Sequence, residues 1–394
     1  MDKRPEAHFK KPRMEHTKIK HHLFSETLKV SLYIANNMAR NNKYMNFDSY
    51  AYIDLFAGSG KFKDDSKGSP LIAVDIAANH LKYKGNVFNK IDLIFIEKDK
   101  QNADDLKKNV GLELKKYNLE ILKNLRVQIG DESWEKYDIE KILNGSTWGF
   151  IFADPFSTEL KLDNLKTTLK NCSKYKDILI FANFNTLARQ YARGHNNDIQ
   201  RICEFLGISE NKLQENIDFP ETFIELLKNK FKSIKDFSIG VAIPISVEQK
   251  LRAMDYFYLV LFTSSVMVGN MFLESYEKEI EQYRSKEKSL FCNQDDEPLL
   301  GLIKENKELS LYKIWEYYQQ NFLSWKKIVN DSNLRVPTLK NITDIINNFK
   351  NNCLLEIVAD EKYFYKKSKN KIGNIKPNDI RSMHDLKSIK IKNK

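Results

Sequence analysis

The chain has 394 residues, of which 42% are hydrophobic and 30% are charged, and its formal net charge is +11. This length predicts two or three domains, and the apolar content excludes a wholly disordered chain. The most apolar run, Tyr256–Gly269, is too short and too rich in hydroxyl groups for a membrane-spanning helix. The first residues lack the apolar core of a secretory signal, so we expect a cytoplasmic protein. The basic balance suits either a polyanionic partner or a solvated, lysine-rich surface.

The cysteines and histidines are not spaced like metal ligands. The four cysteines are far apart in the sequence and form no CxxC pair: Cys172, Cys203, Cys292 and Cys353. The seven histidines form no HExxH motif. These spacings indicate reduced thiols and argue against a zinc or iron–sulfur site. We therefore predict no metal site.

A helix is predicted first, over Thr17–Met38, where apolar residues recur at helical spacing. Short apolar runs typical of strands follow, at Tyr50–Phe56, Ile91–Glu97, Leu125–Ile129, Trp148–Ala153, Asp177–Phe184, Phe237–Val247 and Asp255–Thr263. Helical patterns separate the first five, near Pro70–Tyr83, Asn102–Tyr117, Ile139–Leu143 and Leu162–Cys172. A polar, mostly helical insertion covers residues 196–234. This alternation predicts an α/β fold: a doubly wound, Rossmann-like sheet of seven mostly parallel strands that ends in a hairpin.

A second, smaller unit is expected after the sheet. Helical patterns cover Pro298–Asn306, Ser310–Asn321 and Thr338–Asn351, with Ser310 as a natural N-cap, and two strand-like runs follow at 354–359 and 362–367. Three helices and a two-stranded wing form the order of a winged helix-turn-helix, although a small helical subdomain is the alternative. We divide the chain into a basic N-terminal segment with its helix (1–49), the sheet domain (50–270), a helical connector (271–295), the winged unit (296–367) and a basic tail (368–394).

The first chemical motif follows the first predicted strand. It reads Asp54-Leu-Phe-Ala-Gly58-Ser-Gly60, and acidic residues also end the second and third strands, at Glu97 and Asp131. The carboxyl ends of such strands share one sheet edge, where ligands bind. There Glu97 can accept hydrogen bonds from two ribose hydroxyls, Asp131 can reach an adenine amino group, and Asp54 can hold an ammonium group. The predicted cofactor-binding residues are Asp54, Phe56, Ala57, Gly58, Ser59, Gly60, Glu97, Lys98 and Asp131.

These groups fit S-adenosylmethionine better than other nucleotide cofactors. A dinucleotide site requires GxGxxG, and Lys63 stands at the third glycine position. The phosphate-binding motif GxxxxGK[ST] is missing from the sequence.

The second motif is Asp154-Pro155-Phe156, after the fourth predicted strand. Its carboxylate and a backbone carbonyl beside Pro155 can accept hydrogen bonds from a target amino group, and Phe156 offers a face on which a base can stack. Such contacts would hold the nitrogen in line with the methyl donor. The alternative is that Asp-Pro only ends a strand. We predict these three residues as the catalytic ones.

Taken together, YIDLFAGSG, GSP at Gly68–Pro70, IFIEKD, GD at Gly130–Asp131 and FADPF resemble the three-Cys-motif partner (TcmP) family, over roughly residues 18–365. The resemblance implies a class I S-adenosylmethionine-dependent methyltransferase with a C-terminal winged helix-turn-helix. It also implies a partner protein that carries three cysteines in a motif. DLFAGSG by itself is shared with rRNA guanine-N2 methyltransferases.

The resemblance assigns roles to positions that match the family's motifs. Asp54, Gly58 and Gly60 match the donor-binding loop, Glu97 matches the ribose carboxylate, and Asp131 matches the adenine-side acid. Asp154, Pro155 and Phe156 match the catalytic motif. Adenine amino-methyltransferases usually have two prolines before the aromatic residue, whereas this chain has one, and Ser157 stands where the family often has glycine. Methylation of adenine N6 is therefore one candidate reaction among several, and a paired target base would have to flip out.

Basic residues mark candidate contacts with nucleic acid, either DNA or RNA. We predict such contacts at Arg189, Arg193, Arg335 and Lys340, with an ordinary surface helix as the alternative for Arg189 and Arg193. A basic N-terminal segment either contacts phosphates or forms a solvated tail; it comprises Lys10, Lys11, Arg13, Lys18, Lys20, His21 and His22. Two alternatives to nucleic-acid methylation stay open: a catalytically silent binding module on the same scaffold, and a protein methyltransferase.

Overall fold

The structure is a computed structural model that describes residues 15–41, 48–142, 147–155, 158–170, 176–215, 220–231, 235, 237–244, 256–280, 308–322, 338–351, 355–359, 380 and 389–393. The chain divides into two compact units between Ser264 and Ser265. The last strand of the sheet ends at Thr263, and the helix that begins at Val266 runs past residue 270, the predicted end of the sheet domain.

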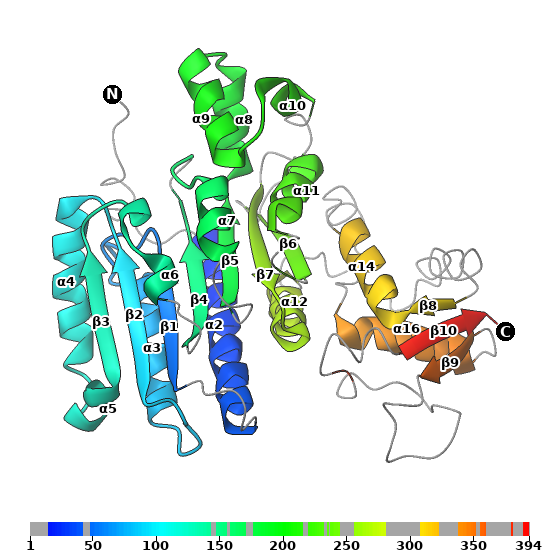
Figure 1. Cartoon of the computed structure of the whole chain (residues 1–394), viewed down its shortest axis with the longest axis horizontal. Helices are drawn as coiled ribbons and strands as arrows, with labels where there is room; N and C mark the ends of the chain where they lie inside the picture. Colours follow the sequence, from blue (N-terminus) through cyan, green and yellow to red (C-terminus); the bar gives the residue numbers. More distant parts are fainter. Residues whose placement is uncertain are drawn as a thin grey trace. The chain divides into compact units, whose positions relative to one another are not determined.

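Unit 1 is built on a seven-stranded sheet. Its strands are β1 (Ser49–Asp54), β2 (Lys90–Ile96), β3 (Leu125–Gly130), β4 (Thr147–Ala153), β5 (Lys176–Ala182), β6 (Phe237–Pro244) and β7 (Tyr256–Thr263). Their order in the sheet is β3-β2-β1-β4-β5-β7-β6 (Figure 1). The first five strands are parallel, and β7 is antiparallel to both β5 and β6. The predicted doubly wound sheet with a terminal hairpin is confirmed. Because the order reverses between β1 and β4, their carboxyl ends form the switch point at which such sheets bind ligands.

Helices cover both faces of this sheet. On one face α2 (Glu15–Asn41), α3 (Ser69–Leu81) and α4 (Lys100–Leu114) lie side by side, and on the other lie α6 (Ile139–Ile142), α7 (Leu162–Lys170) and α11 (Pro220–Phe231) (Figure 1). The remaining helices of the unit are α5 (Leu119–Asn124), α8 (Phe184–Ala192), α9 (Asn196–Leu206) and α10 (Glu210–Gln214). Thus α9 to α11 confirm the helical insertion. The sequence analysis missed α5, a short helix capped by Asn118, whose side chain accepts a hydrogen bond from the Ile121 amide at 3.1 Å.

Helix α2 is bound firmly to the sheet. The buried Phe24 ring packs against Phe152 of β4, with ring centroids 4.6 Å apart. Further along the helix, the Ser31 hydroxyl donates to the buried carboxyl of Asp177, at 2.6 Å, and Thr263 donates to its other oxygen at 2.5 Å. Burial raises the pKa of Asp177. This network lies where β5 begins and β7 ends, so it fixes α2 at the amino edge of the parallel strands.

Unit 2 contains α12 (Val266–Ile280), α14 (Leu311–Phe322) and α16 (Leu339–Asn351), together with β8 (Glu308–Ser310), β9 (Leu355–Ala359) and β10 (Ile389–Asn393). The helices predicted over 310–321 and 338–351 are confirmed. The Ser310 hydroxyl accepts from the Lys313 amide at 3.3 Å, as its predicted capping role requires. The predicted helix at 298–306 and the second wing strand at 362–367 lie outside the described residues.

The end of the chain corrects one prediction. Residues 368–394 are predicted as a basic tail, but Ile389–Asn393 forms β10, the central strand of an antiparallel sheet with order β8-β10-β9. The reason is the alternation in IKIKN: Ile389 and Ile391 are buried, whereas Lys390 and Lys392 are partly exposed. Period-two alternation is a strand signal, and the lysine-rich surroundings hid it. Within the described stretches, no helix has both the length and the apolar character needed to cross a bilayer.

Candidate active site

The glycine loop after β1 (residues 55–60) is tied to the ends of two other strands. The Leu55 amide donates to the carbonyl of Phe152 on β4 at 3.0 Å, and the Ala57 amide donates to Ile96 of β2 at 2.9 Å. Gly58 and Gly60 both have positive φ, at 61° and 77°. A Cβ atom on Gly60 would lie 2.7 Å from Leu106 of α4, so the loop needs glycine there for space as well as for backbone conformation.

Glu97, at the end of β2, holds this loop in place. Its Oε2 atom accepts from the Gly58 amide and its Oε1 atom from the Asp99 amide, both at 2.8 Å. Its own amide donates to the Gly130 carbonyl at 3.0 Å, which joins β2 to β3. Burial raises the pKa of Glu97. Each carboxylate oxygen keeps a free lone pair, so Glu97 can still accept hydrogen bonds from a ligand.

Asp54 is fully buried at the end of β1. Its carboxyl oxygens accept from the Tyr52 hydroxyl at 3.1 Å and from the Phe56 amide at 3.2 Å. Burial raises its pKa to about 7, and the negative charge of Asp154 contributes in the same direction. Asp54 therefore changes its charge near neutral pH, and the two carboxyls are close enough to influence each other.

Asp154 follows β4 and forms an ion pair with Lys20 of α2. The side chain of Lys20 is only 6% exposed, that of Asp154 is 26% exposed, and the ammonium also lies 4.5 Å from the ring centroid of Phe181. This corrects the placement of Lys20 and His21 in a phosphate-contacting or solvated segment. Both are buried, because the helical turn directs them toward the sheet, whereas Lys18 and His22 are exposed.

The other predicted catalytic residues are only partly described. Pro155 is buried directly after Asp154. Phe156 lies outside the described residues, so its stacking role stays a prediction.

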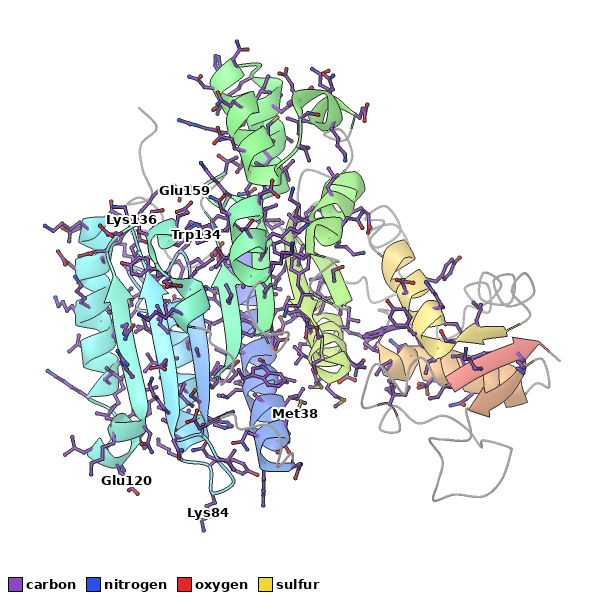
Figure 2. All side chains as sticks on the ribbon, in the orientation of Figure 1. Met38, Lys84, Glu120, Trp134, Lys136 and Glu159 are labelled. Atoms are coloured by element: carbon purple, nitrogen blue, oxygen red, sulfur yellow. The ribbon has the colours of Figure 1, made fainter. Side chains whose placement is uncertain are left out.

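Asp131, predicted to reach an adenine, is exposed after β3, and Lys107 of α4 lies 3.5 Å from its carboxylate. Three residues farther along, Trp134 is buried in a short 3-10 helix, and its indole nitrogen has no hydrogen-bond partner among the described residues. Figure 2 shows Trp134 and Glu159 toward the same end of the sheet, with Lys84 and Glu120 at the opposite end. Sequence reasoning missed Trp134; its only signal was its short distance in sequence from Gly130-Asp131.

An ion pair bridges two of the strand ends. Lys98, directly after Glu97, lies 2.6 Å from Glu159, which follows β4. Because β1 lies between β2 and β4, this pair connects the segments on either side of the glycine loop. Lys98 is half exposed and is predicted to bind the cofactor; its partner Glu159 was not predicted.

The predicted nucleic-acid contacts lie in different units. Arg189 of α8 and Arg193, its C-cap, are exposed in unit 1, and Lys340 of α16 is exposed in unit 2. Arg335 lies outside the described residues.

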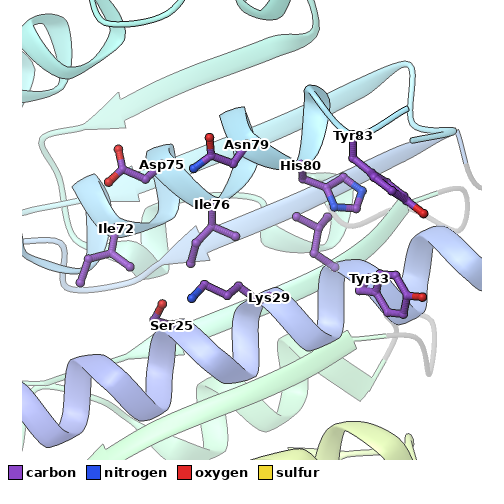
Figure 3. A pocket seen from close by; sticks show the side chains of 10 residues that line it. Ser25, Lys29, Tyr33, Ile72, Asp75, Ile76, Asn79, His80 and Tyr83 are labelled. Atoms are coloured by element: carbon purple, nitrogen blue, oxygen red, sulfur yellow. The ribbon is translucent and has the colours of Figure 1, made fainter. Parts of the chain in front are cut away.

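Neither a metal-ligand cluster nor the groove between α2 and α3 adds a ligand group to the site, as far as the structure describes the chain. In the described part of the chain, no three His, Cys, Asp or Glu side chains gather as metal ligands would. A groove of about 710 Å³ lies between α2 and α3 and is lined by Tyr33, Ile76, His80 and their neighbours (Figure 3). None of the predicted site residues lines it.

No protein-family model matches the chain, and no curated protein matches it in sequence. Solved structures with some similarity include protein LPL1258 from Legionella pneumophila, at 11% identity and a TM-score of 0.35, over 64% of this chain and 86% of that one. Trm1 from Pyrococcus horikoshii with S-adenosylmethionine shows 11% identity and a TM-score of 0.32, over 65% of this chain and 58% of Trm1. The plantazolicin methyltransferase BamL with S-adenosylhomocysteine shows 12% identity and a TM-score of 0.29, over 62% of this chain and 88% of BamL. Likeness this weak assigns neither an activity nor a substrate, and the order and direction of the strands define the fold.

Proposed function

We propose that the chain is an S-adenosylmethionine-dependent methyltransferase of the TcmP type that methylates an amino nitrogen of a nucleic-acid base. The observation that carries this proposal is the meeting of Asp54, Glu97 and Asp154 around a glycine loop at the switch point of the sheet. The carboxylate of Glu97 suits a ribose, and that of Asp54 suits an ammonium group. The carboxylate of Asp154 would face the methyl acceptor.

Each part of the donor has a matching group on this edge. Glu97 would accept from the ribose hydroxyls while it still holds the Gly58 amide. Asp54 in its ionised form would accept from the donor's ammonium group, and Asp131 would accept from the adenine amino group. The backbone of residues 56–60 would lie along the donor, because the two glycines allow close approach.

The acceptor would bind beside Asp154. Lys20 contacts the Oδ2 atom, which leaves Oδ1 to accept a hydrogen bond from a target amino group. The donor supplies a methyl group on a positively charged sulfur. The target nitrogen would take this methyl group as the S–C bond breaks, which would leave S-adenosylhomocysteine, and would then release a proton to water. The contribution of Asp154 is mainly to hold that nitrogen in line with the methyl carbon.

Unit 2 and the basic surface would supply affinity for the polymer. In this proposal unit 2 is a winged helix-turn-helix with Lys340 exposed on α16, and Arg189 and Arg193 contact phosphates from unit 1. A three-Cys-motif protein would be the partner. All of these assignments follow from the family resemblance and from the positive charge.

The single proline after Asp154 favours a second candidate, a silent binding module, and leaves protein methylation open. Incubation of the purified protein with tritium-labelled S-adenosylmethionine and total cellular DNA, RNA and protein separates these cases. We expect label in DNA or RNA. Label in protein alone would make the chain a protein methyltransferase. No label, combined with nucleic-acid binding at low salt, would indicate the silent module.

The pH dependence of donor binding is a further prediction. The pKa of Asp54 is about 7 in the fold and about 3.9 in an unfolded chain. Without a ligand, the folded protein therefore keeps the Asp54 carboxyl protonated up to about pH 7. The contribution of this group to the stability of the fold is full below about pH 4 and is lost as the pH rises through 7. Binding of an ammonium group needs the ionised form, so the affinity for S-adenosylhomocysteine should rise by up to about tenfold per pH unit below 7 and level off above it.

Calorimetric titrations at pH 6, 7 and 8 would measure this dependence. Asp54→Asn, which cannot ionise, is the matched control and should give a flat profile. An equally steep profile for the Asn variant would show that another group is responsible.

A further inference from the structure

Lys20 is a buried cation at the centre of the candidate site. It lies on α2, outside the motifs that mark the donor loop, and its ammonium reaches Asp154 across the sheet edge. Of the described residues, Asp154 and the ring of Phe181 are the contacts of this ammonium. A lysine ammonium has three N–H donors, so the ion pair leaves donors for a ligand.

Two other cations of this edge, within the part of the chain that the structure describes, are more exposed than Lys20. The side chain of Lys98 is 52% exposed and pairs with Glu159, and that of Lys107 is 46% exposed and lies near Asp131. Both belong to the β2–β3 side, where the ribose and adenine would bind. Lys20 is on the β1–β4 side, where Asp54 and Asp154 lie within electrostatic range of each other.

The charges of the donor set a requirement on that side. Its amino-acid end carries an ammonium group and also a carboxylate. Asp54 would attract the ammonium group, but Asp54 and Asp154 would both repel the carboxylate, and desolvating an unpaired carboxylate is costly. A cation beside the carboxylate would offset both this repulsion and the cost of desolvation.

We propose that Lys20 binds the carboxylate of the donor's amino-acid group while its ion pair with Asp154 places it between the donor and the acceptor. This inference depends on the proposed function and deepens it, because it makes α2 part of the donor site. It predicts that the chain distinguishes donor-like nucleosides that carry an amino acid from those that do not.

A pair of ligands tests the assignment without a methyl acceptor. S-adenosylhomocysteine has the amino-acid group, and 5′-methylthioadenosine lacks it but keeps the adenosine and the thioether. For Lys20→Met, we expect the dissociation constant of S-adenosylhomocysteine to rise by about 10- to 100-fold, the effect of losing one charge-assisted hydrogen bond. The constant for 5′-methylthioadenosine should change by less than about twofold, within the small effect expected when no direct contact is lost.

Two further variants keep the test decisive. Lys18→Met removes a charge from an exposed position of the same helix and should affect neither ligand. Because Lys20→Met leaves Asp154 without its partner, the double variant Lys20→Met/Asp154→Asn is compared with Asp154→Asn alone, and the selective loss of S-adenosylhomocysteine binding should persist.

Equal weakening of both ligands, or no weakening of either, would overturn the inference and leave Lys20 as a positioning residue for Asp154. A wild-type protein that is folded but binds neither ligand would instead contradict the proposed function itself. The two failures are therefore distinguishable in one set of titrations.

Discussion

Alanine at both Asp54 and Glu97 should weaken the binding of S-adenosylhomocysteine by at least about 100-fold, because two or more charge-assisted hydrogen bonds of about 1.5–3 kcal/mol each would be lost. Glu97 contributes twice to this effect. It would accept from the ribose, and its two oxygens also hold the amides of Gly58 and Asp99. Without it the Gly58 amide loses its partner, and the bond from the Ala57 amide to Ile96 is what still joins the loop to β2, so the backbone that lines the donor would be less firmly fixed. Isothermal titration calorimetry on the purified variant measures the effect.

The matched control removes the same charge from exposed positions. Glu120 and Glu132 are both exposed, and Figure 2 shows Glu120 far from the candidate site. The Glu120→Ala/Glu132→Ala variant should bind S-adenosylhomocysteine as the wild type does. A thermal melt of each variant confirms that it is folded. Retention of binding within about threefold in a folded Asp54→Ala/Glu97→Ala variant would contradict the proposed donor site, since a loss of under about 1 kcal/mol is less than one such bond contributes.

Replacement of Asp154 should reduce methyl transfer by about 100- to 1,000-fold, the usual loss when a group that orients or stabilises the reacting centre is removed. Asn is the informative substitution, because it keeps the size of the side chain and one carbonyl oxygen but removes the charge that pairs with Lys20. Alanine at position 154 would leave the buried Lys20 ammonium without its ion-pair partner. The measured loss of methyl transfer would then combine an effect on folding with an effect on catalysis. The measurement is tritium incorporation into the polymer fraction that the wild type labels.

Glu159→Gln serves as the control for the Asp154 prediction. Glu159 is in the segment that follows β4, but it pairs with Lys98 rather than with the catalytic position. Donor binding by Asp154→Asn is measured in parallel, so that a loss of turnover is not confused with a loss of donor. If Asp154→Asn labels the polymer at the wild-type rate, the proposed role of Asp154 is wrong.

The sheet could be predicted from sequence because its strands are buried on both faces. Runs such as IDLIFI and WGFIFA are almost continuously apolar, and the helices between them keep an amphipathic pattern. The edge at which the acidic residues meet followed from the same reasoning, since parallel strands place their carboxyl ends together. Short elements were harder: α5 is six residues long and carries little periodicity, and β10 lies within a lysine-rich segment.

Contacts between distant parts of the chain could not be read from motifs. Lys20 precedes Asp154 by 134 positions, and as part of HTKIKHH it resembles a solvated basic segment. Only the packing of α2 against β4 shows that this lysine turns inward. The pairing of Lys98 with Glu159 is hidden in the same way, because it depends on the order of strands in the sheet and not on any local pattern.

The double attachment of α2 has a consequence for where the folding unit begins. The helix meets Asp154 at one edge of the sheet through Lys20 and Asp177 at the other through Ser31. A chain shortened to start at the first strand would therefore have a sheet in which the carboxyl groups of Asp154 and Asp177 lack their partners from α2. It would also expose the apolar surface that Phe24 covers. A version of unit 1 that keeps these contacts has to include α2 (Glu15–Asn41), and a fusion or a circular permutant has to keep this helix joined to the strands that it crosses.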